Sequence, residues 1–252
     1  MELSGFRSPL LRPAERGLAA GPPRSSPSRA RPRITDRDVT ILAWIGRHGV
    51  VTPAQVARRF FSRDRGAVGQ WAAYRRIRKL EQLALIRHDR TFWRESSVLR
   101  LTGAGARIAD VDVHPAHLVL AEIRHTLAVV DLVEALLTNS PPGTMLRTER
   151  ELRGQRRREM RDGRRIPGQG RLPDAVFIHP AGAEVALELD LTPKRSRHVE
   201  RILAAYLSER HYRIVWCVLP RHEQRLWAII REHRADDYME VRAWYPRPTT
   251  QR

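Results

Sequence analysis

Apolar residues recur at helical spacing after residue 34, and capping residues mark where the helices begin. The first helix is predicted to start after Thr35, an N-cap residue followed by acidic side chains, and to end near Gly49. The second is predicted to start at Thr52, with Pro53 in its first turn. Two amphipathic helices are therefore expected in this segment.

A third helix is predicted from about Val68 to Leu85. Four apolar residues recur every three positions and are expected to share one side of it: Trp71, Tyr74, Ile77 and Leu80. Basic residues occupy much of its remaining surface: Arg75, Arg76, Arg78 and Lys79. Two short apolar runs, 85–88 and 97–101, then predict a β-hairpin.

Three helices followed by a two-stranded wing are typical of a winged helix-turn-helix, which we predict for residues 34–112. In helix-turn-helix modules the recognition helix enters the major groove of DNA. The third helix is the expected recognition helix, and five of its residues are candidate DNA contacts: Gln70, Arg75, Arg76, Arg78 and Lys79. The alternative is that these residues form the solvated basic face of an ordinary helix.

Residues 113–140 are predicted to connect the two halves of the chain, with a long helix over 115–137. The apolar residues of this helix cover a wide arc, which would also suit a homodimer contact. His117 and His125 are expected to lie about 80° apart around its axis, so the pair is a weak signal for a metal. A packing role, or a hydrogen-bonded link between the two halves, is expected instead.

The pattern changes after the break at residues 139–143. A basic loop is predicted over 153–165, and strands and helices are predicted to alternate after it. The expected strands cover 174–178, 184–191, 213–219 and 239–244, and the expected helices cover 197–209 and 222–233. This order predicts a small α/β domain over 141–246, and the fold class of the whole chain is therefore α+β.

Three carboxylates stand at the ends of the first two strands of this domain. Asp174 begins one strand, and Glu188 and Asp190 end the next on a shared face, with Lys194 just beyond. Antiparallel pairing would bring these residues together, and carboxylate oxygens are ligands that Mg²⁺ prefers. Asp174, Glu188 and Asp190 are therefore candidate metal ligands, and with Lys194 they are candidate catalytic residues. The alternative is that the carboxylates are paired with some of the many arginines.

Composition adds a preference for an acidic partner. The 252 residues carry a formal net charge of +18, which indicates nucleic acid. Residues 1–33 are rich in Pro, Ser, Gly and Arg and are predicted to be a disordered basic tail, and residues 247–252 a second tail. No apolar run is long enough to span a membrane, and the only cysteine, Cys217, is expected to be an inert core residue. We therefore expect a cytoplasmic protein.

Several of these segments together resemble the replication-relaxation family, whose members occur on actinobacterial plasmids and integrated mobile elements. The resemblance covers roughly residues 34–245 and is carried by Ile34–Asp38, Tyr74–Leu80, His125, Pro173–Asp174 and Glu188–Lys194. It implies a winged-helix N-terminus and a part in relaxing plasmid DNA for replication or transfer.

The C-terminal half also resembles the PD-(D/E)XK nuclease fold. Pro173–Asp174 matches the first pair of that motif, and Glu188 matches the acidic position of its second element. Asp190 stands where the lysine is expected, and Lys194 lies four residues further on.

Three functions follow from these observations. The first is a double-stranded-DNA-binding accessory protein of plasmid or mobile-element replication. The second is a Mg²⁺-dependent DNA nuclease of PD-(D/E)XK type, which the displaced lysine disfavours. The third is a winged-helix transcriptional regulator.

Overall fold

The computed structural model describes residues 33–61, 67–91, 96–112, 116–117, 119–163, 171–209 and 213–246. All the elements named below belong to one compact unit, Ile34–Arg252. Apart from Arg33, the two predicted tails lie outside the described residues, so their predicted disorder stays a prediction.

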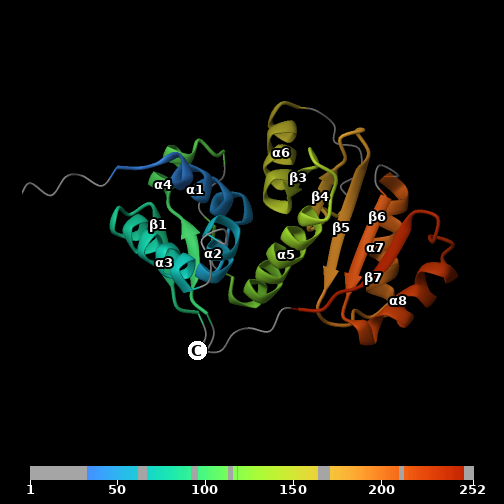
Figure 1. Cartoon of the computed structure of the whole chain (residues 1–252). Helices are drawn as coiled ribbons and strands as arrows, with labels where there is room; N and C mark the ends of the chain where they lie inside the picture. The colour runs from blue at the N-terminus through green and yellow to red at the C-terminus, as the bar shows by residue number, and fades with distance from the viewer. Residues whose placement is uncertain are drawn as a thin grey trace, which may run out of the picture. The chain divides into compact units, whose positions relative to one another are not determined.

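The N-terminal elements follow the predicted order (Figure 1). The helices are α1 (Asp36–His48), α2 (Pro53–Phe61), α3 (Ala67–Gln82) and, after the hairpin, α4 (Gly103–Ala109). The hairpin consists of β1 (Ile86–Asp89) and β2 (Val98–Leu101), which pair in antiparallel register. A single hydrophobic cluster joins α1, α2, α3 and both strands.

Local side-chain chemistry accounts for the ends of these helices. The Thr35 hydroxyl accepts a hydrogen bond from the Asp38 backbone, and the Asp38 carboxylate accepts one from the Thr35 backbone, which forms a capping box. Gly49 ends α1 at φ +82°, a conformation that favours glycine. The Thr52 hydroxyl caps α2 by accepting a hydrogen bond from the Gln55 backbone at 3.1 Å. The predicted caps are thus confirmed.

The buried side of α3 differs from the prediction. Ala73, Ile77 and Leu80 are buried, whereas Trp71 is 72% exposed and Tyr74 is 40% exposed. Positions three apart drift by about 60° per step around a helix, so a run of four such positions turns through half a circle. The buried residues instead follow the four-then-three spacing that keeps to one face. The prediction that all four apolar residues lie along one side of the helix was therefore wrong.

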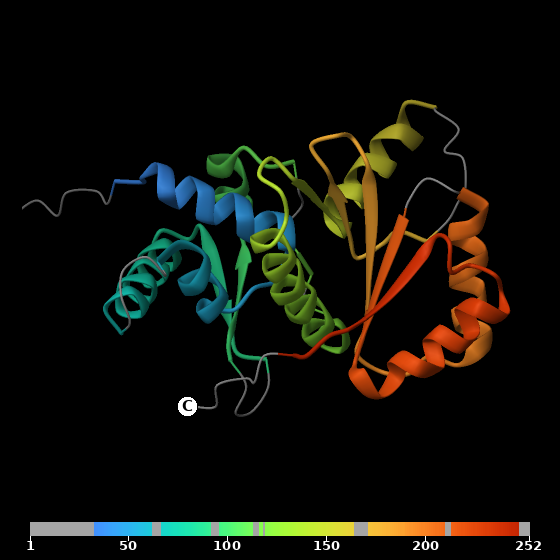
Figure 2. The same ribbon diagram turned by 45° about the vertical axis from the view of Figure 1, so that its right-hand side comes forward.

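Helix α5 (Leu120–Thr138) lies between the N-terminal helices and the C-terminal sheet in both Figure 1 and Figure 2. It begins at Leu120 rather than at residue 115, so His117 precedes it. Its Leu132 and Val133 pack against the sheet. On the other side, the Gln55 amide donates a hydrogen bond to the Leu127 carbonyl at 2.9 Å.

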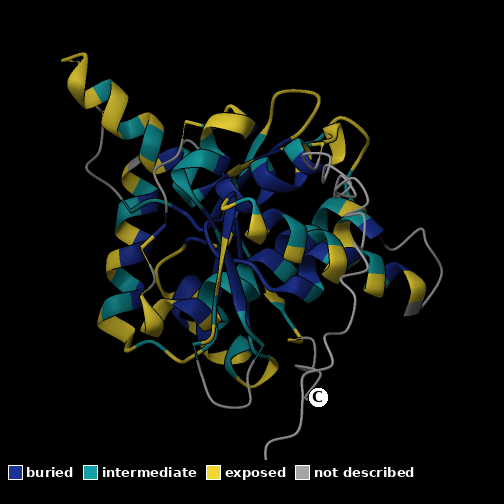
Figure 3. Ribbon diagram, turned by 90° about the vertical axis from the view of Figure 1, so that its left-hand side faces the viewer, coloured by how far each residue is buried: buried dark blue, intermediate teal, exposed yellow. Residues whose placement is uncertain are grey.

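The C-terminal sheet has the order β3-β4-β5-β6-β7. Its strands are β3 (Met145–Thr148), β4 (Ala175–Ile178), β5 (Glu184–Asp190), β6 (Arg213–Val218) and β7 (Met239–Ala243). The first three pair antiparallel, and β5, β6 and β7 pair parallel. Helices α7 (Ser196–Glu209) and α8 (Pro220–Glu232) cover the face opposite α5. Figure 3 shows that the buried, dark blue residues gather in the interior, while the exposed, yellow residues lie on the outer helices and loops.

The segment predicted as a basic loop is helical instead. Helix α6 (Glu149–Arg161) begins with a second capping box, formed by Thr148 and Glu151. Of its residues, Leu152 is buried against β4. Because its sequence is dominated by arginine and has almost no apolar period, only the capping pattern indicated a helix. The described part of the 153–165 loop prediction was therefore wrong.

The fold class is α+β, as predicted. The winged helix-turn-helix, the likeness of the C-terminal half to the nuclease fold and the domain boundaries at 112 and 140 stay predictions. Cys217 is buried in β6, as expected.

Candidate functional site

The four predicted acidic-site residues come together at one end of β4 and β5. Asp174 directly precedes β4. Glu188 and Asp190 lie at the C-terminal end of β5, and Lys194 follows in the connection to α7. The three carboxylates are almost fully buried, at 9%, 0% and 8% exposure respectively.

Backbone pairing fixes Asp174 beside Glu188. Ala175 lies opposite Leu187 in the antiparallel register, which places Asp174 across from Glu188. The Asp174 N–H donates to the Leu187 carbonyl at 3.0 Å, and the Leu189 N–H donates to Asp174 Oδ2 at 2.8 Å. The approach predicted from the strand pattern is therefore present.

Glu188 is held by a guanidinium and a phenol. Arg171 Nε and Nη2 donate to the two carboxylate oxygens at 3.0 and 2.9 Å, and the Tyr206 hydroxyl donates to Oε1. Burial raises the pKa of Glu188, and the hydrogen bond from Arg171 opposes that rise. The same hydrogen bond raises the pKa of Arg171, so the guanidinium stays charged.

Asp190 and Lys194 form a second pair. The Lys194 ammonium contacts Asp190 Oδ1, four residues earlier in the chain. It also lies 5.8 Å from the centre of the Trp216 ring, within the range of a cation–π contact. Burial lowers the pKa of Lys194, and the nearby Arg171 lowers it further.

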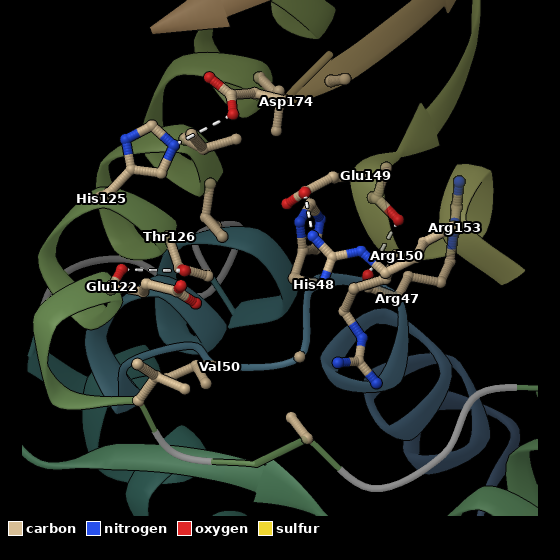
Figure 4. A pocket seen from close by; sticks show the side chains of 18 of the residues that line it. Arg47, His48, Val50, Glu122, His125, Thr126, Glu149, Arg150, Arg153 and Asp174 are labelled. Carbon is tan, nitrogen blue, oxygen red and sulfur yellow. Dashed lines mark hydrogen bonds and ion pairs between the residues drawn. The ribbon is translucent and has the colours of Figure 1, made fainter. Parts of the chain in front are cut away.

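Asp174 is paired with His125 of α5. His125 Nε2 lies 3.1 Å from Asp174 Oδ1, and Figure 4 shows the imidazole reaching toward the carboxylate. The hydrogen bond to Asp174 raises the pKa of His125, while burial of the imidazole opposes it. This hydrogen bond joins α5 to the start of β4, and the expected role of His125 as a link between the two predicted halves stays a prediction.

Each predicted metal ligand therefore already has a partner. A Mg²⁺ ion needs several oxygen ligands that can turn toward it. Here Glu188 faces Arg171, Asp190 faces Lys194 and Asp174 faces His125, so in this arrangement the carboxylates do not fit such an ion. Within the described residues, no group of three or more His, Cys, Asp or Glu side chains is placed to hold a metal. A magnesium centre at these residues stays a prediction.

A cavity of about 320 Å³ opens beside the His125–Asp174 pair. The end of α1, helix α5 and helix α6 line it, and Figure 4 shows Arg47, Arg150 and Arg153 around its other side. His48 also borders it, and burial, reinforced by Arg47, lowers the pKa of His48 to about 3. This imidazole is therefore neutral near neutral pH.

The predicted DNA contacts occupy different surroundings on α3. Arg75 and Arg78 are exposed, and Gln70 and Lys79 are partly exposed. Arg76 instead turns toward α1, where its guanidinium binds both oxygens of Asp38. Whether any of these residues contacts DNA stays a prediction.

Asp38 is fully buried beneath α3. Although burial raises its pKa, hydrogen bonds from Arg76 and Thr35 lower it more, so the pKa of Asp38 lies below its ordinary value. Arg76 therefore attaches α3 to the cap of α1, a structural task that the basic pattern of the helix did not reveal.

Comparison with known proteins gives one match. Residues 42–213, more than half of the chain, match the replication-relaxation family. The chain belongs to the replication-relaxation family. No curated protein matches the chain, and no solved structure matches it.

Membership of the replication-relaxation family supports a role in plasmid or mobile-element replication. The matched region extends from Leu42 in α1 to Arg213 at the start of β6, so it contains both α3 and the paired acidic cluster. In the parts of this replication-relaxation protein that the structure describes, no helix is long and apolar enough to cross a membrane.

Two residues of the cluster were missed by sequence reasoning. Arg171 lies outside any helix or strand, so no periodic pattern marked it. Tyr206 occupies a buried position of α7, in step with Val199 and Leu203, and its pattern indicates only a core residue. Its hydroxyl, which needs a partner when buried, was the available signal.

Proposed function

We propose that this replication-relaxation protein binds double-stranded DNA through α3 and acts as an accessory protein in plasmid or mobile-element replication. The observation that carries the proposal is the exposed pair Arg75 and Arg78 on a helix fixed in place by the Arg76–Asp38 contact. Exposed arginines on a rigid helix can neutralise phosphates or bind base edges.

Two further features support the proposal. The order α1, α2, α3 and an antiparallel hairpin is the order of elements in winged helix-turn-helix modules, where one helix enters the major groove. The net charge of +18 favours association with a polyanion.

Binding of a duplex under a salt titration tests the proposal. The variant Arg75→Ala/Arg78→Ala should bind more weakly than the wild type, because two phosphate or base contacts are lost. Its plot of log affinity against log salt should be shallower by about one for each phosphate contact removed. Fluorescence anisotropy of a labelled duplex gives both quantities.

A matched control removes two exposed arginines from α8, Arg221→Ala/Arg231→Ala. This variant has the same net charge as the test variant and should bind nearly as well as the wild type. Equal weakening in both variants would show that total charge alone governs binding and would contradict a role for α3. No duplex binding at low salt would exclude the proposed function.

The competing function is cleavage of DNA by a centre formed by Asp174, Glu188, Asp190 and Lys194. The convergence of these residues favours it, and their pairing with Arg171, His125 and one another opposes it. We expect supercoiled plasmid to stay intact with Mg²⁺ and either wild type or Asp174→Asn. Nicking by the wild type that the variant lacks would establish cleavage instead.

A further inference from the structure

The exposed side of α3 is aromatic as well as basic. Val68 and Trp71 are each 72% exposed, and Tyr74 is 40% exposed. At 100° per residue, these three side chains and the exposed Arg75 and Arg78 fall within an arc of about 120°. We call these five residues the α3 face.

Ring surface on the α3 face is left in water. Removal of apolar surface from water is favourable by about 25 cal/mol per Å². Burial of this exposed indole ring against a partner would therefore stabilise a complex. By comparison, Trp44 and Trp216 are buried in the two halves of the same unit. Trp71 thus presents an aromatic surface that the described fold does not use.

The chemistry of the face favours unpaired bases over a closed duplex. The base edges in the major groove present mostly polar donors and acceptors, with the thymine methyl as the apolar exception. Flat base surfaces become available only where the bases are unstacked. Stacking of an aromatic ring on such a base contributes about 1–3 kcal/mol, and it tolerates any base sequence.

The spacing of the two rings and the charge of the α3 face also favour unpaired bases. Side chains three apart on a helix have their Cβ atoms about 5–6 Å apart, more than the 3.4 Å rise per base along a stacked strand. Trp71 and Tyr74 therefore suit bases that have been drawn apart. Arg75 and Arg78 each follow one of the rings by four residues, one turn along the same face, and are therefore placed to neutralise phosphates adjoining those bases.

We propose that the α3 face binds single-stranded DNA, with Trp71 and Tyr74 stacking on unpaired bases and Arg75 and Arg78 neutralising the backbone. This inference rests on the proposed DNA-binding function and adds single-stranded DNA as a second form of DNA that the same surface binds. A protein that acts in replication meets such strands wherever the duplex is opened.

Tryptophan fluorescence and affinity, measured on the full chain, test the inference. The probes are an oligothymidylate strand and a mixed-sequence duplex of equal length. Binding of the strand should quench the fluorescence of the wild type. Trp71→Phe should keep the affinity for the strand while losing much of the quenching, because a ring remains but the indole is gone.

Removal of the ring should affect the two DNA forms differently. Trp71→Ala should weaken strand binding about 5- to 150-fold, the equivalent of one lost stacking contact. Its affinity for the duplex should change by less than about twofold. Tyr238→Ala, which removes an exposed tyrosine before β7, serves as the control and should change neither affinity.

The outcomes separate this inference from the proposed function. If the wild type binds the duplex through Arg75 and Arg78, but Trp71→Ala binds the strand as well as the wild type without loss of quenching, stacking is wrong and duplex binding stands. If neither DNA form binds at low salt, the proposed function fails as well. If Trp71→Ala converts a dimer to a monomer in sedimentation experiments, the face is a protein interface and the inference is overturned.

Discussion

At the scale of single residues, the most consequential feature is a fully buried carboxylate. Glu188 has no exposed surface, and Arg171 and Tyr206 supply its hydrogen bonds. Burial of an ion is costly unless its hydrogen-bonding capacity is satisfied. The stability of this end of the sheet therefore depends on the completeness of the Glu188 contacts.

Removal of Arg171 should destabilise the protein strongly. Loss of one partner from a buried ion pair typically costs about 3–5 kcal/mol, because the other charge is left unpaired. We expect Arg171→Ala to lower the free energy of unfolding by an amount of that order in urea titrations. Arg197→Ala, on the exposed side of α7, should change it by less than about 0.5 kcal/mol.

The double variant Arg171→Ala/Glu188→Gln identifies the cause. A neutral amide avoids the unpaired buried charge, so the double variant should recover part of the stability lost in Arg171→Ala. If it is no more stable than the single variant, the loss comes from packing of the arginine side chain, and the explanation by charge is wrong.

The pair His125–Asp174 should make stability depend on pH. Its hydrogen bond raises the pKa of His125 in the folded state above the unfolded value of about 6.5. The pair therefore contributes stability fully below that unfolded pKa, as long as Asp174 is ionised, and loses it as pH rises through the folded pKa.

Unfolding free energies of the wild type and His125→Gln, measured across this pH range, check the sign. The unfolding free energy of the wild type should exceed that of the variant most at acidic pH, and the difference should shrink toward alkaline pH. A difference that stays constant with pH would contradict the assignment, and a histidine NMR titration gives the folded pKa directly.

At the scale of elements, α3 combines a structural and a proposed binding task on neighbouring arginines. Arg76 binds the buried Asp38, whereas Arg75 points away from the core and is exposed. Arg76→Ala should therefore lower stability by about 3–5 kcal/mol, because it leaves a buried carboxylate without its ion-pair partner. Arg75→Ala should leave stability within about 0.5 kcal/mol of the wild type.

Thermal unfolding and duplex binding of the two single variants separate these tasks. Under conditions where both are folded, Arg75→Ala should bind DNA more weakly. If Arg76→Ala is as stable as the wild type, the contact with Asp38 does not hold α3 in place.

The elements that the sequence predicts well are those with local signals. Thr35 and Thr52 cap α1 and α2 through hydrogen bonds to residues three positions on, so a few letters suffice to place each helix start. Short apolar runs likewise predict β4 and β5 and their antiparallel pairing. The approach of Asp174 to Glu188 follows from that register.

Other features depend on contacts that are distant in sequence. The side-chain partners of Glu188 are 17 and 18 residues away, and the basic partners of Asp38 and Asp174 are 38 and 49 residues away. In a chain with many arginines, composition cannot select which one reaches a given carboxylate. The same ambiguity explains why the structural role of Arg76 was not predicted, whereas α6 was missed because its sequence has almost no apolar period.

At the scale of the whole described unit, side-chain bonds join the N-terminal helices to the C-terminal half. The Trp44 indole donates to Glu134 of α5 at 3.0 Å, and Arg47 of α1 binds Glu151 of α6 at 2.7 Å. Gly49 passes so close to α6 that an added Cβ would lie 2.8 Å from the Arg150 side chain. These contacts link α1, against which α3 packs, to α5 and α6 beside the sheet that holds the acidic cluster.

These contacts predict that a substitution between the two halves changes the stability of both. Glu151 binds Arg47 and also completes the capping box of α6, so Glu151→Ala should cost about 1–2 kcal/mol. If residues 34–252 open as one cooperative unit, hydrogen exchange of the slowest amides should rise by a similar factor in α1 and in β6. Glu159→Ala, which removes a contact to Gln155 within α6, should leave both unchanged. A rise confined to α6 would show instead that the two halves open independently, and that the contacts of Arg47 do not couple the N-terminal helices to the sheet.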